Sequence, residues 1–438
     1  MPYPLCLQAC GGPGKCGTSV INLSQAFKVT VTDASWPHEL PPTRDAALAR
    51  IAAVRPDAYA RTRNALDGAV TGLSPYLTHG LVTLPEVLAG VLEREPLPAG
   101  HKLLYEFGWR EYFRHVWAHE GDGILASLHA GPLPDDAYSS VLPADIREGR
   151  TGVPVIDQAV RTLYATGRLH NHARMWLASY VVHLRHIHWR AGADWMLAHL
   201  FDGDRASNHL SWQWVAGTAS HKPYLFNADN VARFAPGEWH SPGSVIDQSY
   251  TALEQHARDA ARLADDHCRA GTGPGPGLPD EYYAEPTLYA RPPERPGLHT
   301  PDSPSAEIAG REVWLVHPWA LRQPPTSVPD DALLIGVYLT DYHQAWPWPE
   351  ARWRWVDSAM AASTAESWVI SAAELTALLA PAALVRSIDN PHIGRLLRSV
   401  AQLDPEPLLF PVVEQRCSSF SQWWKHATRG LERAEELV

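Results

Sequence analysis

The sequence predicts a mainly α-helical protein in which a smaller α/β segment with a parallel sheet follows the helices. Residues 43–240 read as one helix after another, without the alternation of apolar and polar residues that marks a half-buried strand. Residues 311–438 show short apolar runs separated by helical stretches, which is typical of a parallel sheet. Residues 241–310 are expected to form a helix and then a Pro/Gly-rich linker, and residues 1–42 a poorly patterned tail.

The composition is that of a globular protein and excludes one class of nucleic-acid binder. Of the 438 residues, 45% are hydrophobic, which is enough for a large core. The formal net charge is −11, whereas a protein that coats nucleic acid without specificity needs a strong basic field. A local basic cleft is compatible with this charge. The 18 tryptophans suit core packing and also planar ligands.

The five cysteines favour a reducing compartment. Their odd number and scattered positions do not fit a disulfide framework, so we expect a cytoplasmic protein. Cys6, Cys10 and Cys16 would need a fourth ligand from far away in the chain to hold a metal, and a tail without metal is the simpler interpretation. No apolar run approaches the length that spans a membrane, so no membrane association is expected.

Several elements carry clear signals. Residues 151–167 combine a capping Thr151, a proline at position 154, one apolar face and a stop at Gly167. Residues 170–190 have no clean polar face and are expected to form one mostly buried helix. The expected strands are 313–316, 333–339, 368–370, 384–388 and 408–413, with helices at 350–362 and 393–401.

The strongest chemical signal is Asp202-Gly203-Asp204, which precedes an aromatic helix. Two carboxylates this close repel each other, so they need donors such as helix N-termini, sugar hydroxyls or arginines. On its own, this motif fits an ordinary aspartate turn and helix cap. Three further stretches are weak individually and gain weight from their order and spacing: 104–111, 170–175 and 189–192.

Together these motifs resemble the FAD-binding domain of photolyases and cryptochromes, from about residue 59 to residue 227. The resemblance covers well under half of the chain and rests on five motifs in the family's order. They are Leu73 to Leu77, Trp109-Arg110-Glu111, Thr151 to Asp157, His170 to Met175, and Asp202 to Trp214.

The resemblance implies FAD as a noncovalent cofactor. The cofactor-binding residues that it implies are Tyr59, Thr71, Ser74, Arg110, Arg174, Asp202, Asp204 and Asn208. The first three match contacts to the phosphate and ribityl groups, and a hydroxyl-lined loop suits a pyrophosphate. Arg174 and the two aspartates match groups around the isoalloxazine and ribose. Asn208 matches the residue that faces flavin N5, where hydrogen bonding tunes the reduced state.

The resemblance also implies a substrate pocket and an electron-transfer chain. The residues that match the family's lesion pocket are Glu106, Trp109, Asn171, Met175 and Trp214. In the family, stacking and a carboxyl group hold a flipped-out pyrimidine dimer there. Trp212 and Trp189 match the inner and middle tryptophans that reduce photoexcited flavin, and Tyr138 lies near the place of the outer one.

These roles favour light-driven repair of cyclobutane pyrimidine dimers in damaged DNA, with single strands bound better than intact duplex because unpairing costs less there. A cryptochrome-like blue-light or redox sensor that binds FAD without repair is the main alternative. A flavin-free relic is a third interpretation, which the intact set of Asp202, Asp204 and Asn208 disfavours.

The sequence departs from the family pattern in several places. His172 stands where the family has arginine, Val70 replaces a hydroxyl residue, and no tryptophan occurs between Trp117 and Trp176. The family carries an α/β domain before the helical one, whereas the α/β segment expected here follows it. A circular permutation explains this order, and an unrelated small α/β module is the alternative.

Overall fold

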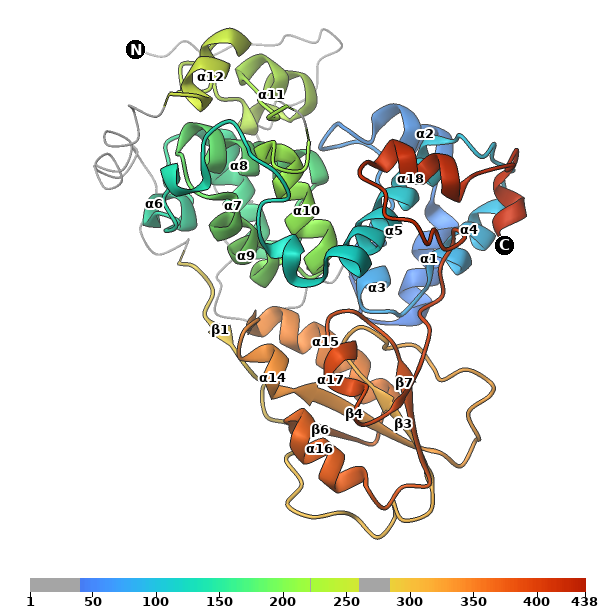
Figure 1. Cartoon of the computed structure of the whole chain (residues 1–438). Helices are drawn as coiled ribbons and strands as arrows, with labels where there is room; N and C mark the ends of the chain where they lie inside the picture. Colours follow the sequence, from blue (N-terminus) through green and yellow to red (C-terminus); the bar gives the residue numbers. More distant parts are fainter. Residues whose placement is uncertain (1–39, 221, 260–283) are drawn as a thin grey trace, which may run out of the picture. The chain divides into compact units, whose positions relative to one another are not determined.

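The computed structural model describes residues 40–220, 222–259 and 284–438 (Figure 1). Nearly all of the expected tail lies outside the described residues, together with Cys6, Cys10, Cys16 and Cys268. Twelve α-helices are described between residues 44 and 257. They are α1 (Arg44–Ala53), α2 (Pro56–Thr62), α3 (Ser74–Thr78), α4 (Leu84–Leu92), α5 (Lys102–Glu120), α6 (Ala144–Arg147), α7 (Pro154–Thr166), α8 (Asn171–Ser179), α9 (Trp189–His199), α10 (Arg205–Ala216), α11 (Ala228–Phe234) and α12 (Tyr250–Ala257).

Short-range signals set the ends of these helices. Helix α7 ends at Gly167, whose φ of 62° is left-handed, as the sequence predicts. Thr151 does not cap α7, because Val153 is the residue before its first turn. Instead, the Thr151 hydroxyl donates to Asp157 Oδ1 at 2.7 Å. Helix α10 begins at Asp204, whose side chain accepts from the Ser207 N–H at 2.8 Å.

The prediction of a single helix over residues 170–190 is wrong. The chain forms α8, one π-helical turn at Tyr180–Leu184 and then α9, with a break where His186 has a φ of 48°. The imidazole of His188 caps α9 by accepting from the Arg190 N–H at 3.2 Å. The segment is buried as expected, but a side chain that caps a new helix start interrupts the backbone hydrogen bonding.

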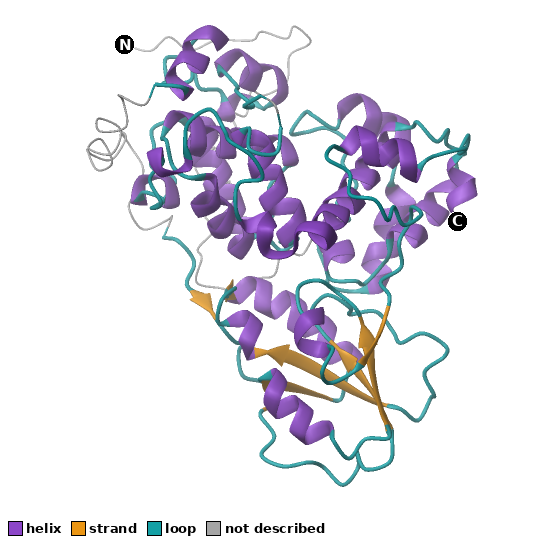
Figure 2. Cartoon of the chain, in the orientation of Figure 1, coloured by secondary structure: helices purple, strands orange, loops and turns teal. Residues whose placement is uncertain are grey.

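The α/β segment contains a six-stranded parallel sheet in the order β2-β6-β4-β3-β7-β8, as predicted for the class (Figure 2). Its strands are β2 (Leu298–His299), β3 (Glu312–Val316), β4 (Leu333–Leu339), β6 (Glu366–Ile370), β7 (Leu384–Ile388) and β8 (Gln402–Asp404). Two short strands, β1 (Leu288–Tyr289) and β5 (Trp348–Pro349), pair antiparallel. The helices are α14 (Thr340–His343), α15 (Glu350–Ser363), α16 (Ala372–Leu379), α17 (Gly394–Leu397) and α18 (Phe420–Ala427).

The strand order reverses between β3 and β7. The chain moves outward from β3 through β4 to β6 and then crosses back to β7. Because parallel crossovers are right-handed, α15 and α16 lie on opposite faces of the sheet, which agrees with Figure 1.

Two expectations for this segment differ from the structure. Residues 408–413 are not a strand, because the N–H groups of Leu409 and Phe410 donate to the Glu111 carboxylate instead of to a neighbouring strand. Strands β1 and β2 fall inside the stretch expected to be only a linker. The proposed boundaries at 43–240 and 311–438 stay a prediction, because the core of α1–α5 is continuous with that of the sheet.

Candidate functional site

The turn Asp202-Gly203-Asp204 joins α9 to α10 at the centre of the site. Asp204 is almost fully buried, and its Oδ2 lies 2.9 Å from Arg114 Nη2 on α5. Burial alone would raise the pKa of Asp204, but the guanidinium groups of Arg114 and Arg110 outweigh it and hold the pKa well below its usual value. Asp204 is therefore a carboxylate at neutral pH.

Asp202 is fixed from two sides. Arg174 on α8 donates from Nη2 to both carboxylate oxygens of Asp202, at 2.9 and 2.8 Å. Arg110 Nη2 donates to the Thr78 hydroxyl at 3.3 Å, and that hydroxyl lies 3.3 Å from the Asp202 carbonyl. Arginines from two helices thus surround both carboxylates, as the repulsion between the aspartates requires.

The hydroxyl residues Thr71 and Ser74 lie in the loop before α3 and at the first position of that helix, respectively. Between them, Gly72 has a φ of 63°, and a Cβ there would come 2.7 Å from Arg50 Nη1 and 3.6 Å from Arg168 Nη2. Both guanidinium groups therefore lie beside the loop, where they suit an anionic group such as a pyrophosphate. Sequence reasoning missed these two arginines, because neither belongs to a motif.

A polar atom close to these elements has no partner within the described parts of the chain. It is Ser207 Oγ, in the first turn of α10, which is buried without a hydrogen bond. Such atoms are rare in native proteins and indicate that a polar group is missing. Asn208 is buried, and its amide donates to the Ala193 carbonyl at 2.8 Å. The donor set fits a ligand with phosphates, hydroxyls and a polar ring.

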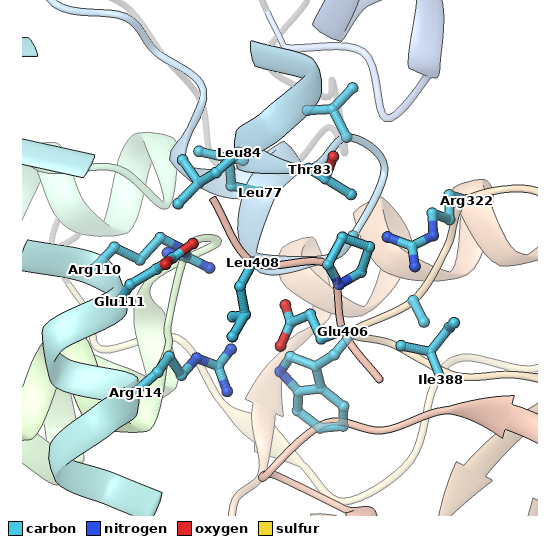
Figure 3. Close-up of a pocket in the computed structure, with 15 residues that line it drawn as sticks. Leu77, Thr83, Leu84, Arg110, Glu111, Arg114, Arg322, Ile388, Glu406 and Leu408 are labelled. Atoms are coloured by element: carbon cyan, nitrogen blue, oxygen red, sulfur yellow. The ribbon is translucent and has the colours of Figure 1, made fainter. Parts of the chain in front are cut away.

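A small cavity of about 40 Å³ adjoins these arginines at the junction with the sheet. Figure 3 shows Arg110, Glu111 and Arg114 of α5 on one side and Glu406 and Arg322 on the other. This volume holds about three water molecules and is too small for a dinucleotide, so we do not assign the cofactor to it.

Comparison with known proteins identifies the helical segment. Residues 103–244 match the family described as the FAD binding domain of DNA photolyase. This segment is similar to the flavin-binding domain of the photolyase/cryptochrome family. Its cofactor is FAD, as the sequence motifs imply.

The chain is similar to curated members of both branches of the family. It is 34% identical over 210 residues to a deoxyribodipyrimidine photo-lyase of Thermus thermophilus, covering 46% of this chain and 48% of that protein. It is 35% identical over 153 residues to the enzyme of the same name from Streptomyces griseus, covering 35% and 33%. Cryptochrome DASH of Oryza sativa is 34% identical over 171 residues, covering 37% and 29%. The matches thus span between 29% and 48% of these relatives' length.

Solved structures of the family align over about half of the chain. A Synechocystis cryptochrome aligns with a TM-score of 0.42 and 24% identity, over 52% of this chain and 55% of that one. An archaeal photolyase from Sulfolobus tokodaii with two FAD molecules aligns with a TM-score of 0.39 and 24% identity, over 49% of each chain.

In the flavin domain, the two tryptophans expected to carry electrons are both buried and lie on α9 and α10, two helices that pack together. Trp212 on α10 packs on Gly192, where a Cβ would come 2.3 Å from Trp212 Cη2. Gly192 lies one turn after Trp189, whose indole N–H donates to Ser127 Oγ at 2.9 Å. The path continues through His188 to Tyr138, with ring centroids 5.6 Å apart for Trp189–His188 and 6.3 Å for His188–Tyr138.

The residues that resemble the lesion pocket are only partly brought together. Asn171 and Met175 meet on α8, with Nδ2 3.7 Å from Sδ. Glu106 pairs with Lys102 Nζ at 2.8 Å and Arg63 Nε at 3.3 Å. The remaining two residues, Trp109 and Trp214, make contacts outside this group. Trp214 is partly exposed beside Tyr224, whereas Trp109 stacks on Phe420 of α18 at 4.0 Å.

Within the described parts of the chain, no helix combines the length and the apolar character that crossing a membrane requires.

Proposed function

We propose that this protein is a light-driven flavoprotein that splits cyclobutane pyrimidine dimers in DNA. FAD supplies the electron when it is bound and excited. The observation that carries the proposal is on α5, where Glu106 lies one helical turn before Arg110 of the cofactor-binding set. A dimer held by the Glu106 carboxyl would therefore lie next to the cofactor.

The surroundings of Glu106 suit a nucleic-acid substrate. Arg63 and Lys102 flank this carboxylate and are themselves partly exposed, so they can turn to phosphates when DNA binds. Asn171 is exposed at the start of α8 and offers an amide for a base edge. In this proposal Glu106 hydrogen-bonds the dimer, and Asn171 and Met175 form one wall of the pocket that holds it.

The DNA partner is proposed to be a lesion in a single strand. His172 is buried, and its Nδ1–H donates to the Asn64 carbonyl at 2.7 Å. Burial lowers the pKa of His172, so at neutral pH it supplies no charge where the family has arginine. Together with the net charge of −11, this disfavours opening of an intact duplex.

The test is light-dependent loss of dimers from a short oligonucleotide, with FAD-loaded, prereduced protein. Glu106→Gln should lower the repair rate and leave the FAD content unchanged. Glu254→Gln, on the exposed face of α12, is the matched control and should repair like wild type. If the reduced wild type repairs neither single nor double strands while its flavin stays photoreducible, the repair proposal is wrong.

A cryptochrome-like sensor is the second candidate, and one observation favours it. Phe420 covers the face of Trp109 that a base would use for stacking. A sensor needs no open pocket. In a sensor, the segment that lies on α5 would change its conformation when the state of the flavin changes, and this change would be the signal. Light-dependent change in proteolysis of residues 405–438, without repair, would support this candidate.

We also propose that the chain is a circular permutation of the family's architecture, because its α/β segment follows the flavin domain. The parallel sheet is the supporting observation. A permuted gene that places 311–438 before residue 43 should then yield a folded protein that still binds FAD.

A further inference from the structure

Arg352 on α15 reaches from the sheet segment to the turn between α9 and α10. Its side chain is 1% exposed, Nη1 donates to the Leu197 carbonyl at 3.0 Å, and Nη2 donates to the Gly203 carbonyl at 3.0 Å. Its guanidinium lies 4.0 Å from the ring centroid of Trp348. Arg352 thus joins the last turn of α9 to the residue between the two aspartates.

Gly203 is needed for this contact. A Cβ at this position would come 2.6 Å from Arg352 Nη1 and 2.6 Å from the Leu197 carbonyl oxygen. The glycine between Asp202 and Asp204 therefore admits the guanidinium, which then binds the peptide that links the two carboxylate residues.

The charge of Arg352 also acts on this turn. Burial lowers the pKa of Arg352 to about 10, and Tyr342, Asp202 and Asp204 oppose that shift. The guanidinium remains charged at neutral pH. Within the described residues it forms no ion pair with a carboxylate at contact distance, so its positive charge acts on Asp202 and Asp204 from behind the turn.

His392, which follows β7, holds the other end of the turn. Its Nε2 accepts from the Arg205 N–H at 3.2 Å and lies 3.9 Å from Asp204 Oδ2. Its Nδ1 lies 2.7 Å from Asn390 Oδ1 and donates to it, which leaves Nε2 free to accept. Burial lowers the pKa of His392 far below its ordinary value, which matches the neutral form that this arrangement requires.

We infer that Arg352 and His392 are positioning residues of the flavin site, through which the α/β segment sets the orientation of the Asp202 and Asp204 carboxylates toward FAD. The inference rests on the proposed roles of the two aspartates. The sheet segment is then a part of the cofactor site and not only an attached module. Neither residue has to touch the flavin, since both act on the backbone that carries the carboxylates.

The experiment compares Arg352→Gln, Arg352→Lys and His392→Ala in the full chain. We expect Arg352→Gln to weaken FAD binding about tenfold or more, because a charged donor to two buried carbonyls is lost, and Lys to restore part of it. The flavin absorption maxima and the flavin midpoint potential should shift as well, since the Asp202 and Asp204 charges move. His392→Ala should act in the same direction.

Arg295→Gln is the matched control. Arg295 precedes strand β2 of the same sheet and pairs with Asp357 of α15 at 2.6 Å, but it does not contact the turn. It should lower the melting temperature without changing the FAD dissociation constant, the spectrum or the potential. Equal weakening of FAD binding by Arg295→Gln and Arg352→Gln would overturn the inference, because general destabilisation would then explain both.

Two further outcomes are decisive. A folded Arg352→Gln variant with the dissociation constant, spectrum and potential of wild type also overturns the inference. If Arg352→Gln does not fold, the comparison uses Arg352→Lys, which must still shift the potential. Repair is measured separately with Glu106→Gln, so failure of the repair proposal leaves FAD binding and this test intact.

Discussion

Phe420 lies flat on Trp109, with ring centroids 4.0 Å apart and ring planes 10° apart. The edge of Tyr105 meets Phe420 at 4.6 Å, and Trp424 occupies the space that a side chain at position 108 would fill. The C-terminal helix α18 therefore packs on the residue that resembles one wall of the lesion pocket. Repair requires that Phe420 move away from Trp109 so that a base can stack there. A sensor does not require this movement.

Phe420→Ala should uncover Trp109. We expect tighter binding of dimer-containing single strands and faster repair, together with a loss of about 3 kcal/mol of unfolding free energy from the deleted buried ring. Phe410→Ala is the control, because Phe410 is equally buried against Trp423 and Trp424 and does not stack on Trp109. If both variants change repair alike, covering of Trp109 is not the cause.

Stability should depend on pH through Glu111. Burial raises the pKa of Glu111 to about 7, although hydrogen bonds from the Leu409 and Phe410 N–H groups oppose the shift. The folded state then holds a proton that the unfolded state releases above about pH 4.5. Unfolding free energy should fall as pH rises from about 4.5 to 7, by up to about 1.4 kcal/mol per pH unit. Denaturant titrations should show this slope reduced in Glu111→Gln.

The sequence predicts correctly those helix ends and strands that depend on residues close together in the chain. The stop at Gly167 and the parallel strands β3, β4, β6 and β7 all follow from local residue types and are confirmed. The family motifs identify FAD as well. The predicted roles of the individual site residues stay predictions.

Contacts between distant residues account for what the sequence did not predict. Residues 408–413 have the apolar pattern of a strand, but Glu111, almost 300 residues earlier, takes two of their N–H groups. The contact of Arg352 with Gly203 spans 149 positions. No local pattern distinguishes Arg352 from other arginines on a helix, which are usually solvated.

Asp202→Ala should remove most of the FAD. The substitution leaves the partly buried Arg174 without its carboxylate, and unpaired charges of this kind cost about 2 to 3 kcal/mol, or about 30- to 150-fold in affinity. The measurement is the FAD to protein ratio after purification and the dissociation constant by flavin fluorescence. Asp229→Ala, at an exposed position of α11, should keep its FAD. Full FAD content in Asp202→Ala would show that this carboxylate is not needed for the cofactor.

Photoreduction should follow the rings from the buried Trp212 and Trp189 through His188 to Tyr138, of which the last two are partly exposed. Trp212→Phe should slow it about tenfold or more, an increase of about 1.4 kcal/mol or more in activation free energy, because phenylalanine is much harder to oxidise than indole. Trp195→Phe is the control, since Trp195 is a buried tryptophan of α9 that contacts Tyr164 instead of this path.

Oxidation of Tyr138, the last step of this path, also requires the loss of a proton. Burial raises the pKa of Tyr138 to about 12, so it is a neutral phenol at physiological pH and must lose its proton when it is oxidised. His188 and His186 are the neighbouring bases, with ring centroids 6.3 and 6.5 Å from Tyr138. Tyr138→Phe should leave the first electron transfer unchanged and shorten the lifetime of the charge-separated state, because the electron then returns from Trp189. In wild type, the decay measured by transient absorption should slow in D2O, and this solvent effect should vanish in Tyr138→Phe. A solvent effect that persists in the variant would assign the terminal donor to another residue.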